Sequence, residues 1–325
     1  SDVCSSDLRR EAGLDGAAVW GWRLFLVAVA LLVALTIRLG LSWPIAVGTV
    51  LLMLMTFLVV SRLSAETGLF FIQPGWQPFG ALMPLFGAYA MGPTSIVTSA
   101  LVCGVLCIDQ SQALMPYLVN GLKIGESVRL RPLPLAGWAA GVCAVGIVLA
   151  VAVVLLVSYD FGTPTHYHWS YYRIPTMPFR AAEPALMQLR ATGLLEESEG
   201  LTGLQRLLAM RPEHKYLWAA GSGFVGVVVF TMLRLRVPWW PLHPALFLIW
   251  ATYPLAAMSH SFLLGWLVKK AALRFGGNRL VQRLRPLAIG VIAGEISGAL
   301  VFMAVGAVYF FCTGRKPVTY RFFPR

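Results

Sequence analysis

Charged side chains are scarce in this sequence, and acidic ones are the scarcest. Only 12% of the 325 residues are charged, with 14 Asp and Glu against 26 Lys and Arg. A soluble domain usually carries about twice this charged fraction. Because hydrophobic residues make up 58% of the chain, polar groups cannot cover its whole surface. The composition excludes an ordinary soluble domain and predicts an integral membrane protein.

Common catalytic motifs are missing, and cysteine is rare. The sequence has no HExxH motif, no P-loop and no GxSxG elbow. The stretch AAGSGFVG (219–226) resembles a membrane serine-protease elbow only loosely, because Ala220 stands where the first Gly belongs. Three cysteines, Cys103, Cys107 and Cys143, lie in predicted membrane segments, which argues against a disulfide framework. The sequence predicts no cofactor, and an enzyme is not the favoured class.

The first eight residues, SDVCSSDL, differ in character from the apolar sequence that follows. Reverse translation of residues 1–8 as TCA-GAC-GTG-TGC-TCT-TCC-GAT-CT matches the 3′ end of a common sequencing adapter. We therefore expect an artefactual leader in preference to a natural polar one. This interpretation also predicts that the natural N-terminus is missing and that the chain is part of a longer protein.

Apolar runs of membrane-spanning length recur along the chain. A spanning helix needs roughly 20 apolar residues. The runs that meet or approach this length are 20–37, 43–60, 134–159, 216–233 and 287–311. Basic residues follow these runs, as Arg38 and Arg62 do, so the excess positive charge is interpreted as topogenic and not as a nucleic-acid surface.

Two other apolar segments are interrupted. The sequence MGPTS breaks segment 81–110 at Gly92 and Pro93, where proline removes a backbone donor, and this predicts two half-helices. Segment 237–268 carries four prolines, among them Pro244, and fits either a re-entrant hairpin or one kinked span. Segment 64–80 is too rich in Gly and Pro for a simple helix.

A polar region separates the two groups of apolar segments and contains two short amphipathic stretches, 184–195 and 201–210. Four leucines of the second stretch share one helical face: Leu201, Leu204, Leu207 and Leu208. We expect this region to form a small extramembrane cap. The predicted organisation is membrane helices over 9–158, the cap over 159–215, further membrane helices over 216–311 and a basic tail over 312–325.

Charge placement suggests an orientation. Residues 269–285 contain six basic residues and no acid, which is typical of a cytoplasmic loop. Placing this loop, the 120–131 loop and the Arg234–Arg236 pair inside requires 237–268 to enter and leave on one face, and it puts the cap outside. A kinked single span over 237–268 would instead place 269–285 outside.

Glu295 is the first candidate site residue. A carboxylate inside a span is costly and usually faces a cavity or a partner. Glu295 therefore either belongs to a proton or cation path, or is paired with a basic residue such as Lys123 or Arg274. Glycines at 290, 294 and 298 permit close helix packing around it.

The other polar candidates are scattered. Asp109 follows one interrupted segment, and His243 lies in the other, where a proton relay competes with a structural role. His166 and His168 form an HxH pair that lacks a third metal ligand nearby, so no metal site is predicted. Under an enzyme hypothesis, these histidines and Glu183 would be the active groups.

Residues 239–295 contain three motifs. These are Trp-x-Pro-x-His-Pro, a Trp–Lys pair before an Arg-aromatic-Gly-Gly turn, and a Pro-opened span with Gly-Glu. The matching residues are Trp239 or Trp240, His243, Pro244, Trp266, Lys269, Arg274, Phe275, Gly276, Gly277, Pro286, Gly294 and Glu295. In these motifs the chain resembles a bacterial family of large multipass membrane proteins of unknown function. This resemblance covers about a fifth of the chain and implies no established activity. The broken segments are distantly similar to those of oligopeptide transporters.

These patterns predict an all-α fold, a polytopic transmembrane helical bundle with broken or re-entrant helices and a small extramembrane cap. The favoured function is a secondary-transporter-like permease fragment with a midplane polar site for a small solute or peptide, coupled to protons or cations. Its candidate residues are Gly92, Pro93, Asp109, Lys123, His243, Pro244 and Glu295. The alternatives are a membrane-embedded enzyme with active groups in 160–215 and a non-transporting structural subunit. The expected location is the bacterial cytoplasmic (inner) membrane, with the lipid bilayer as partner, no nucleic acid, and homo-oligomerisation left open.

Overall fold

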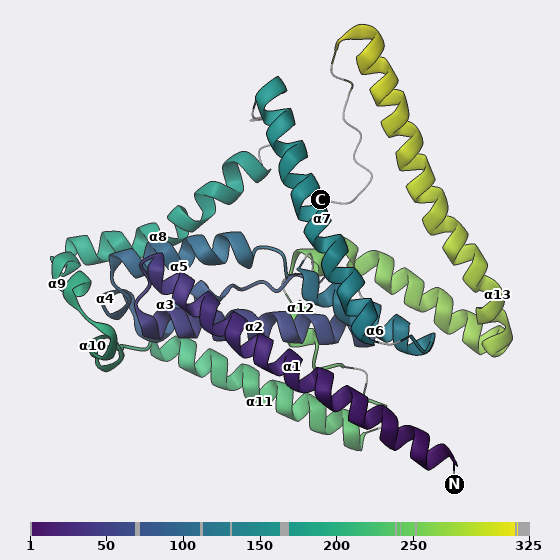
Figure 1. The fold of residues 1–325 in the computed structure, drawn as a ribbon, viewed down its shortest axis with the longest axis horizontal. Helices are drawn as coiled ribbons and strands as arrows, with labels where there is room; N and C mark the ends of the chain where they lie inside the picture. The colour runs from purple at the N-terminus through teal and green to yellow at the C-terminus, as the bar shows by residue number, and fades with distance from the viewer. Residues whose placement is uncertain are drawn as a thin grey trace. The chain divides into compact units, whose positions relative to one another are not determined.

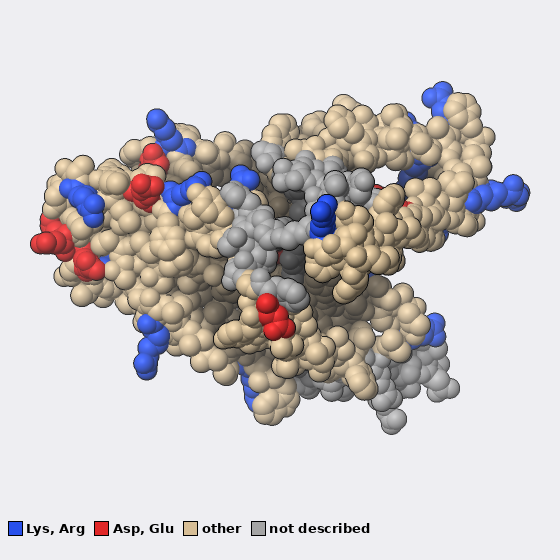
Figure 2. Space-filling model, turned by 90° about the horizontal axis from the view of Figure 1, so that it is seen from above, with Lys and Arg blue, Asp and Glu red and all other residues tan. Residues whose placement is uncertain are grey.

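The computed structural model describes residues 2–68, 72–110, 113–130, 132–162, 169–237, 239–240, 242–250, 252–315 and 317. These residues form thirteen α-helices and no strand (Figure 1). Five stretches are long and apolar enough to cross a membrane: Val19–Arg38, Trp43–Thr67, Pro134–Asp160, His214–Arg236 and Leu255–Thr313. Charged residues are sparse on the face drawn in Figure 2. The predicted fold class, an all-α helical membrane bundle, is confirmed.

The chain forms two compact units, Ser1–Trp250 and Ala251–Arg325. The helices of the first unit are α1 (Asp2–Arg38), α2 (Trp43–Thr67), α3 (Pro78–Phe86), α4 (Ala88–Met91), α5 (Pro93–Leu106), α6 (Leu114–Ser127), α7 (Pro132–Phe161), α8 (Ile174–Ala191), α9 (Leu195–Gly200), α10 (Gly203–Leu208), α11 (His214–Arg236) and α12 (Leu246–Ile249). A π-helical turn, Trp169–Arg173, precedes α8. The second unit contains α13 (Tyr253–Thr313). The origin of residues 1–8 stays a prediction, although α1 begins at Asp2.

Arg62 does not end the second span, contrary to the sequence-based expectation. Helix α2 continues to Thr67, and Nε of Arg62 lies 2.8 Å from Oε1 of Glu66 in an exposed ion pair one turn ahead. The helix ends where Gly68 takes up a left-handed conformation with φ +72° and ψ 11°. This conformation favours glycine, which carries no Cβ.

The predicted half-helices meet at Gly92, and a second interruption lies at Gly87. Helix α4 ends at Met91 and α5 begins at Pro93, with φ +72° and ψ 156° at Gly92 between them. Gly87, with φ +80° and ψ 156°, separates α3 from α4. Segment 81–110 is therefore broken twice within six residues, and the sequence analysis identified only the second break.

The hydrophobic core of the first unit brings α8 of the expected cap together with α2, α3, α4 and α5. Its fully buried members include Ile45, Met91, Ile96 and Cys103, and Leu189 of α8 is also buried. Figure 1 shows α8 lying alongside α5. Helix α8 is therefore packed against the bundle, and its expected position outside the membrane stays a prediction.

Two stretches that were expected to be loops are largely helical. Residues 120–127 belong to α6, where Asn120 donates from Nδ2 to Oγ of Ser64 at 3.0 Å and thereby attaches α6 to α2. Residues 269–285 belong to α13, which is interrupted only at Gly277. Residues 269–285 are rich in Leu, Lys, Arg and Gln, which favour helices, whereas residues 120–127 contain two glycines and are held in the helix by contacts with α2.

The described residues of segment 237–268 contain two helical stretches, and the choice between a re-entrant hairpin and one kinked span stays a prediction. Residues 246–249 form one helical turn, α12, and helix starts again at Tyr253. From there, α13 runs through residue 268 into the basic stretch. Of the prolines in this segment, Pro244 precedes α12 and Pro254 lies in the first turn of α13, where the missing N–H has no intrahelical partner to lose.

Candidate functional site

The double break of segment 81–110 exposes backbone carbonyls at the ends of α3 and α4. The last carbonyls of a helix have no intrahelical partner and need donors from elsewhere. Four of them, in Pro84, Phe86, Ala90 and Met91, accept hydrogen bonds from one distant stretch, residues 206–213. We call residues 206–213 the clamp segment.

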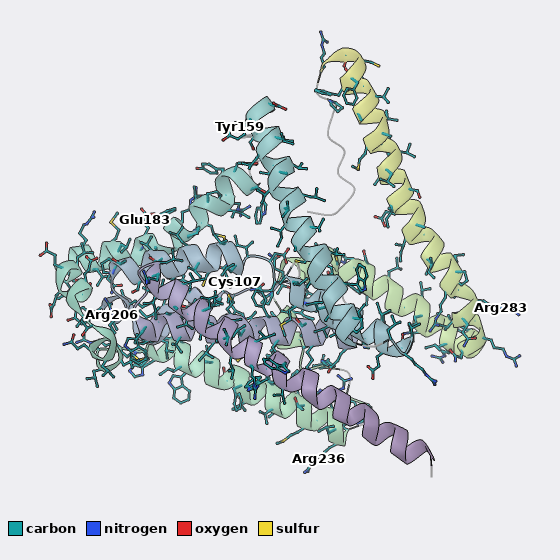
Figure 3. All side chains as sticks on the ribbon, viewed as in Figure 1. Cys107, Tyr159, Glu183, Arg206, Arg236 and Arg283 are labelled. Atoms are coloured by element: carbon teal, nitrogen blue, oxygen red, sulfur yellow. The ribbon has the colours of Figure 1, made fainter. Side chains whose placement is uncertain are left out.

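Arg206 of α10 provides the clamp segment's charged donor. Its Nη1 donates to the carbonyl oxygens of Ala90 at 3.1 Å and of Met91 at 2.6 Å. Its Nη2 lies 3.4 Å from the carbonyl oxygen of Glu199. The side chain is only 6% exposed and lies where α4, α9 and α10 meet (Figure 3). A single guanidinium thus binds three carbonyl oxygens at the α4–α5 break.

Glycine at position 92 makes this approach possible. A Cβ there would lie 2.4 Å from Nη1 of Arg206 and 2.9 Å from the carbonyl oxygen of Ser198. The backbone angles of Gly92 also belong to a region that is populated essentially by glycine alone. Position 92 is therefore fixed as glycine by its conformation and by the close approach of the clamp segment.

The remainder of the clamp segment binds α3 through its backbone. The N–H groups of Arg211 and Glu213 donate to the carbonyls of Phe86 at 3.1 Å and Pro84 at 2.9 Å. Just beyond the segment, the Tyr216 hydroxyl donates to the carbonyl of Gly80 at 3.0 Å. The start of α11 is thereby attached to α3, and both interruptions are covered.

Two carboxylates of α9 lie at the same break. Oε1 of Glu197 accepts a hydrogen bond from the Tyr89 hydroxyl at 2.8 Å, and Oε1 of Glu199 accepts one from the Thr94 hydroxyl at 2.7 Å. Glu199 thus places negative charge at the first turn of α5, where the helix dipole favours it. The break is surrounded by oxygen acceptors.

The electrostatics of Arg206 reflect its burial. Burial lowers the pKa of Arg206 from its ordinary value, and the attraction of Glu199 opposes this shift. Arginine nevertheless stays protonated in proteins, so a full positive charge is buried here. Nε of Arg206 is also buried and has no hydrogen-bond partner among the described residues. The site is rich in hydrogen bonds but not fully satisfied.

The break lies near the beginning of α2 and not beside its middle. The N–H of Ser42, just before α2, lies 3.4 Å from Oγ of Ser95, and the hydroxyls of Thr49 and Ser99 are 3.5 Å apart. Helices α2 and α5 therefore run in the same direction from neighbouring starting points. The break thus lies beside the start of α2, and the expected midplane position of a polar site stays a prediction.

Asp109 and Lys123 lie at the far end of α5 and α2. Asp109 follows α5, whose 14 residues correspond to about 21 Å of helix from the break. Lys123 donates from Nζ to the carbonyl of Ala65, near the end of α2. The structure therefore does not bring these two residues to Gly92 and Pro93.

His243 and Pro244 belong to a turn that packs on the other half of α11. Nδ1 of His243 accepts the N–H of Ala245 at 3.0 Å, which stabilises the turn before α12. Phe247 of α12 lies 5.0 Å from Phe230 of α11, ring centre to ring centre. Phe230 is about 21 Å along α11 from Tyr216, which contacts α3. The two interrupted segments thus contact different parts of α11, and the choice between a proton relay and a structural role for His243 stays open.

Glu295 lies in the second unit and is exposed on α13. Within the described part of that unit, its carboxylate forms no ion pair or hydrogen bond, and its pairing with a basic residue such as Lys123 or Arg274 stays a prediction. His166 and His168 lie outside the described residues, whereas Glu183 is exposed on α8. No group of three metal-ligating side chains occurs among the residues that the structure describes.

A family model for DUF6785, a family of unknown function, matches residues 6–324. The chain belongs to the DUF6785 family. No curated protein and no solved structure matches it. The expected membership of an uncharacterised membrane protein family is confirmed, and the site of this DUF6785 chain has to be interpreted from its own geometry.

Sequence reasoning missed Arg206 in this DUF6785 chain. It identified the leucine face of residues 201–210, but in α10 the leucines point outward, with Leu204 68% and Leu208 88% exposed, and Arg206 is buried. The reason is that the side of α10 that faces the break carries Arg206, which binds the carbonyls there. A hint in the sequence was a lone charged residue, Arg206, in the mostly apolar stretch LQRLLAM, which is unusual for a solvent-facing helix.

Proposed function

We propose that this DUF6785 chain is a permease-like protein of the bacterial cytoplasmic membrane, and that the α4–α5 break is its solute site. One observation carries the proposal: the break presents carbonyl oxygens that bind a cationic side chain from the clamp segment. Transporters commonly use the free backbone groups of discontinuous helices to bind substrates and ions. In this proposal, Arg206 occupies the site in a closed state.

The chemistry of the site favours a cation that can donate hydrogen bonds. Its acceptors are the carbonyls of Ala90, Met91 and Glu199, with two carboxylates nearby. Guanidinium and primary ammonium groups match such acceptors, whereas a quaternary ammonium has no N–H donor. Displacement of Arg206 by such a solute would free the clamp segment, and this motion would couple binding to opening.

The test uses guanidinium as the simplest stand-in for the Arg206 head group. We expect low millimolar guanidinium to raise the thermal stability of purified Arg206→Ala, because it refills the carbonyl site. Tetramethylammonium, which has the same charge and no donors, should not. The variant Arg190→Ala, which removes an exposed arginine of α8, is the matched control and should not respond.

Transport is measured separately, as uptake of labelled guanidinium into proteoliposomes. Arg206→Ala should raise uptake at least about tenfold over wild type and over Arg190→Ala. A tenfold increase corresponds to removing about 1.4 kcal/mol of competition between the Arg206 head group and the solute. Guanidinium binding without any uptake in either variant would overturn the permease proposal. It would favour the structural-subunit alternative, in which Arg206 simply joins the interrupted helix to α10.

A further inference from the structure

The bend of α13 collects positive charge. Six basic side chains lie within eight residues of Gly277, and all are exposed: Lys269, Lys270, Arg274, Arg279, Arg283 and Arg285. No acidic residue occurs between 269 and 285, and Glu295 is the only acid in residues 251–325. Arg283 is labelled at the bend in Figure 3. The bend is therefore a strongly cationic surface with no acid among its own residues to neutralise it.

Two adjacent glycines build the bend. Gly277 has φ +61° and ψ −163°, and it divides α13 into two arms (Figure 1). A Cβ on Gly276 would lie 2.4 Å from Cδ2 of Leu280, so Leu280 folds back tightly onto the turn. This tight reversal concentrates basic side chains from both arms at one place.

Both arms become strongly apolar on leaving the bend. Residues 255–268 precede the basic stretch and 287–311 follow it, and both are apolar and largely exposed. If lipid tails cover the arms, the bend lies at the level of the headgroups. Two observations fit this level. Phe275 is 85% exposed at the turn, and Nζ of Lys270 lies 4.5 Å from the ring centre of Trp266.

We infer that the bend of α13 binds the phosphate groups of anionic phospholipids in the adjacent leaflet. Basic juxtamembrane segments are attracted to anionic lipid by about 1 kcal/mol per residue. Arginine also offers paired donors that match phosphate oxygens. The exposed Phe275 and Trp266 add apolar contact with the interface, which a free anion in water would not use. The partner is therefore a lipid headgroup and not soluble phosphate.

The experiment compares two lipids with the same acyl chains. Detergent-purified full-length chain is titrated with a phosphatidylglycerol or a phosphatidylcholine, and bound lipid is counted by native mass spectrometry. We expect the wild-type chain to prefer the phosphatidylglycerol. The triple variant R279Q/R283Q/R285Q should bind it about a hundredfold more weakly, at about fivefold per arginine.

Two controls keep this test decisive. R180Q/R190Q/K215Q removes the same charge from exposed residues of the first unit and should bind lipid as the wild type does. If R279Q/R283Q/R285Q does not fold, K269Q/K270Q/R274Q tests the other arm, with the same expected loss. Equal affinity for the two lipids, or an equal loss in the control triple, would overturn the inference. So would complete displacement of the lipid by inorganic phosphate at matched ionic strength.

Discussion

Replacement of Arg206 by methionine tests the clamp segment most directly. Methionine keeps a similar unbranched stem and removes every donor, so the carbonyls of Ala90 and Met91 lose their partner. Arg190→Met is the matched control, because Arg190 is exposed on neighbouring α8. The expected effect is local opening of α9 and α10 away from the α4–α5 break.

The size of the effect follows from the contacts. Two hydrogen bonds to a charged donor are worth about 1.5–3 kcal/mol each, or about 3–6 kcal/mol together. Part of this loss in stability is offset, because methionine at position 206 removes the cost of burying a charge. We therefore expect the free energy of local opening to fall by about 2–4 kcal/mol. The contact of Nη2 with Glu199, at 3.4 Å, adds little.

A cysteine at position 198 reports the opening. Ser198 of α9 is fully buried, and its carbonyl lies beside Gly92, so Ser198→Cys is a small change next to the α4–α5 break. Its rate of maleimide labelling is followed by mass spectrometry, with the exposed Cys312 as the internal standard. If the opened site closes faster than it is labelled, a fall of about 2–4 kcal/mol in the free energy of local opening corresponds to about 30- to 700-fold faster labelling in Arg206→Met. Unchanged labelling, or an equal acceleration in Arg190→Met, would refute the assigned role of Arg206.

Two further predictions concern glycines. Gly92→Ala should lower the unfolding free energy by about 3 kcal/mol or more, because it adds both backbone strain and a collision with Arg206. Gly68→Ala, which has the same φ and open space around it, should cost only about 1–2 kcal/mol in a detergent unfolding titration. Gly104→Ala places a Cβ 2.6 Å from Cγ of Pro178 and should cost about 1–3 kcal/mol by separating α5 from α8. Gly121→Ala, in open space on α6, should be neutral or slightly stabilising. A larger loss of unfolding free energy in Gly68→Ala than in Gly92→Ala, or in Gly121→Ala than in Gly104→Ala, would contradict the packing described.

Local patterns predicted the long helices and the break at Gly92 well. Apolar runs such as 134–159 correspond to a helix because lipid leaves the backbone no other way to satisfy its hydrogen bonds. Proline at 93 ends the preceding helix for a purely local reason, since it lacks an N–H. Helix ends were less predictable. Arg62 was expected to close α2, but the helix continues past the Arg62–Glu66 ion pair and ends at Gly68, which takes up a left-handed conformation.

The sequence alone determined the environment of this protein, through its low charge and its apolar runs, because solvation of a helix depends on its own side chains. It did not determine which residues form the candidate site. Arg206 is separated by more than a hundred residues from the carbonyls that it binds, and its burial contradicts the pattern of the leucines around it. Only the tertiary structure decided this, because the partner of a buried charge is set by how distant helices pack.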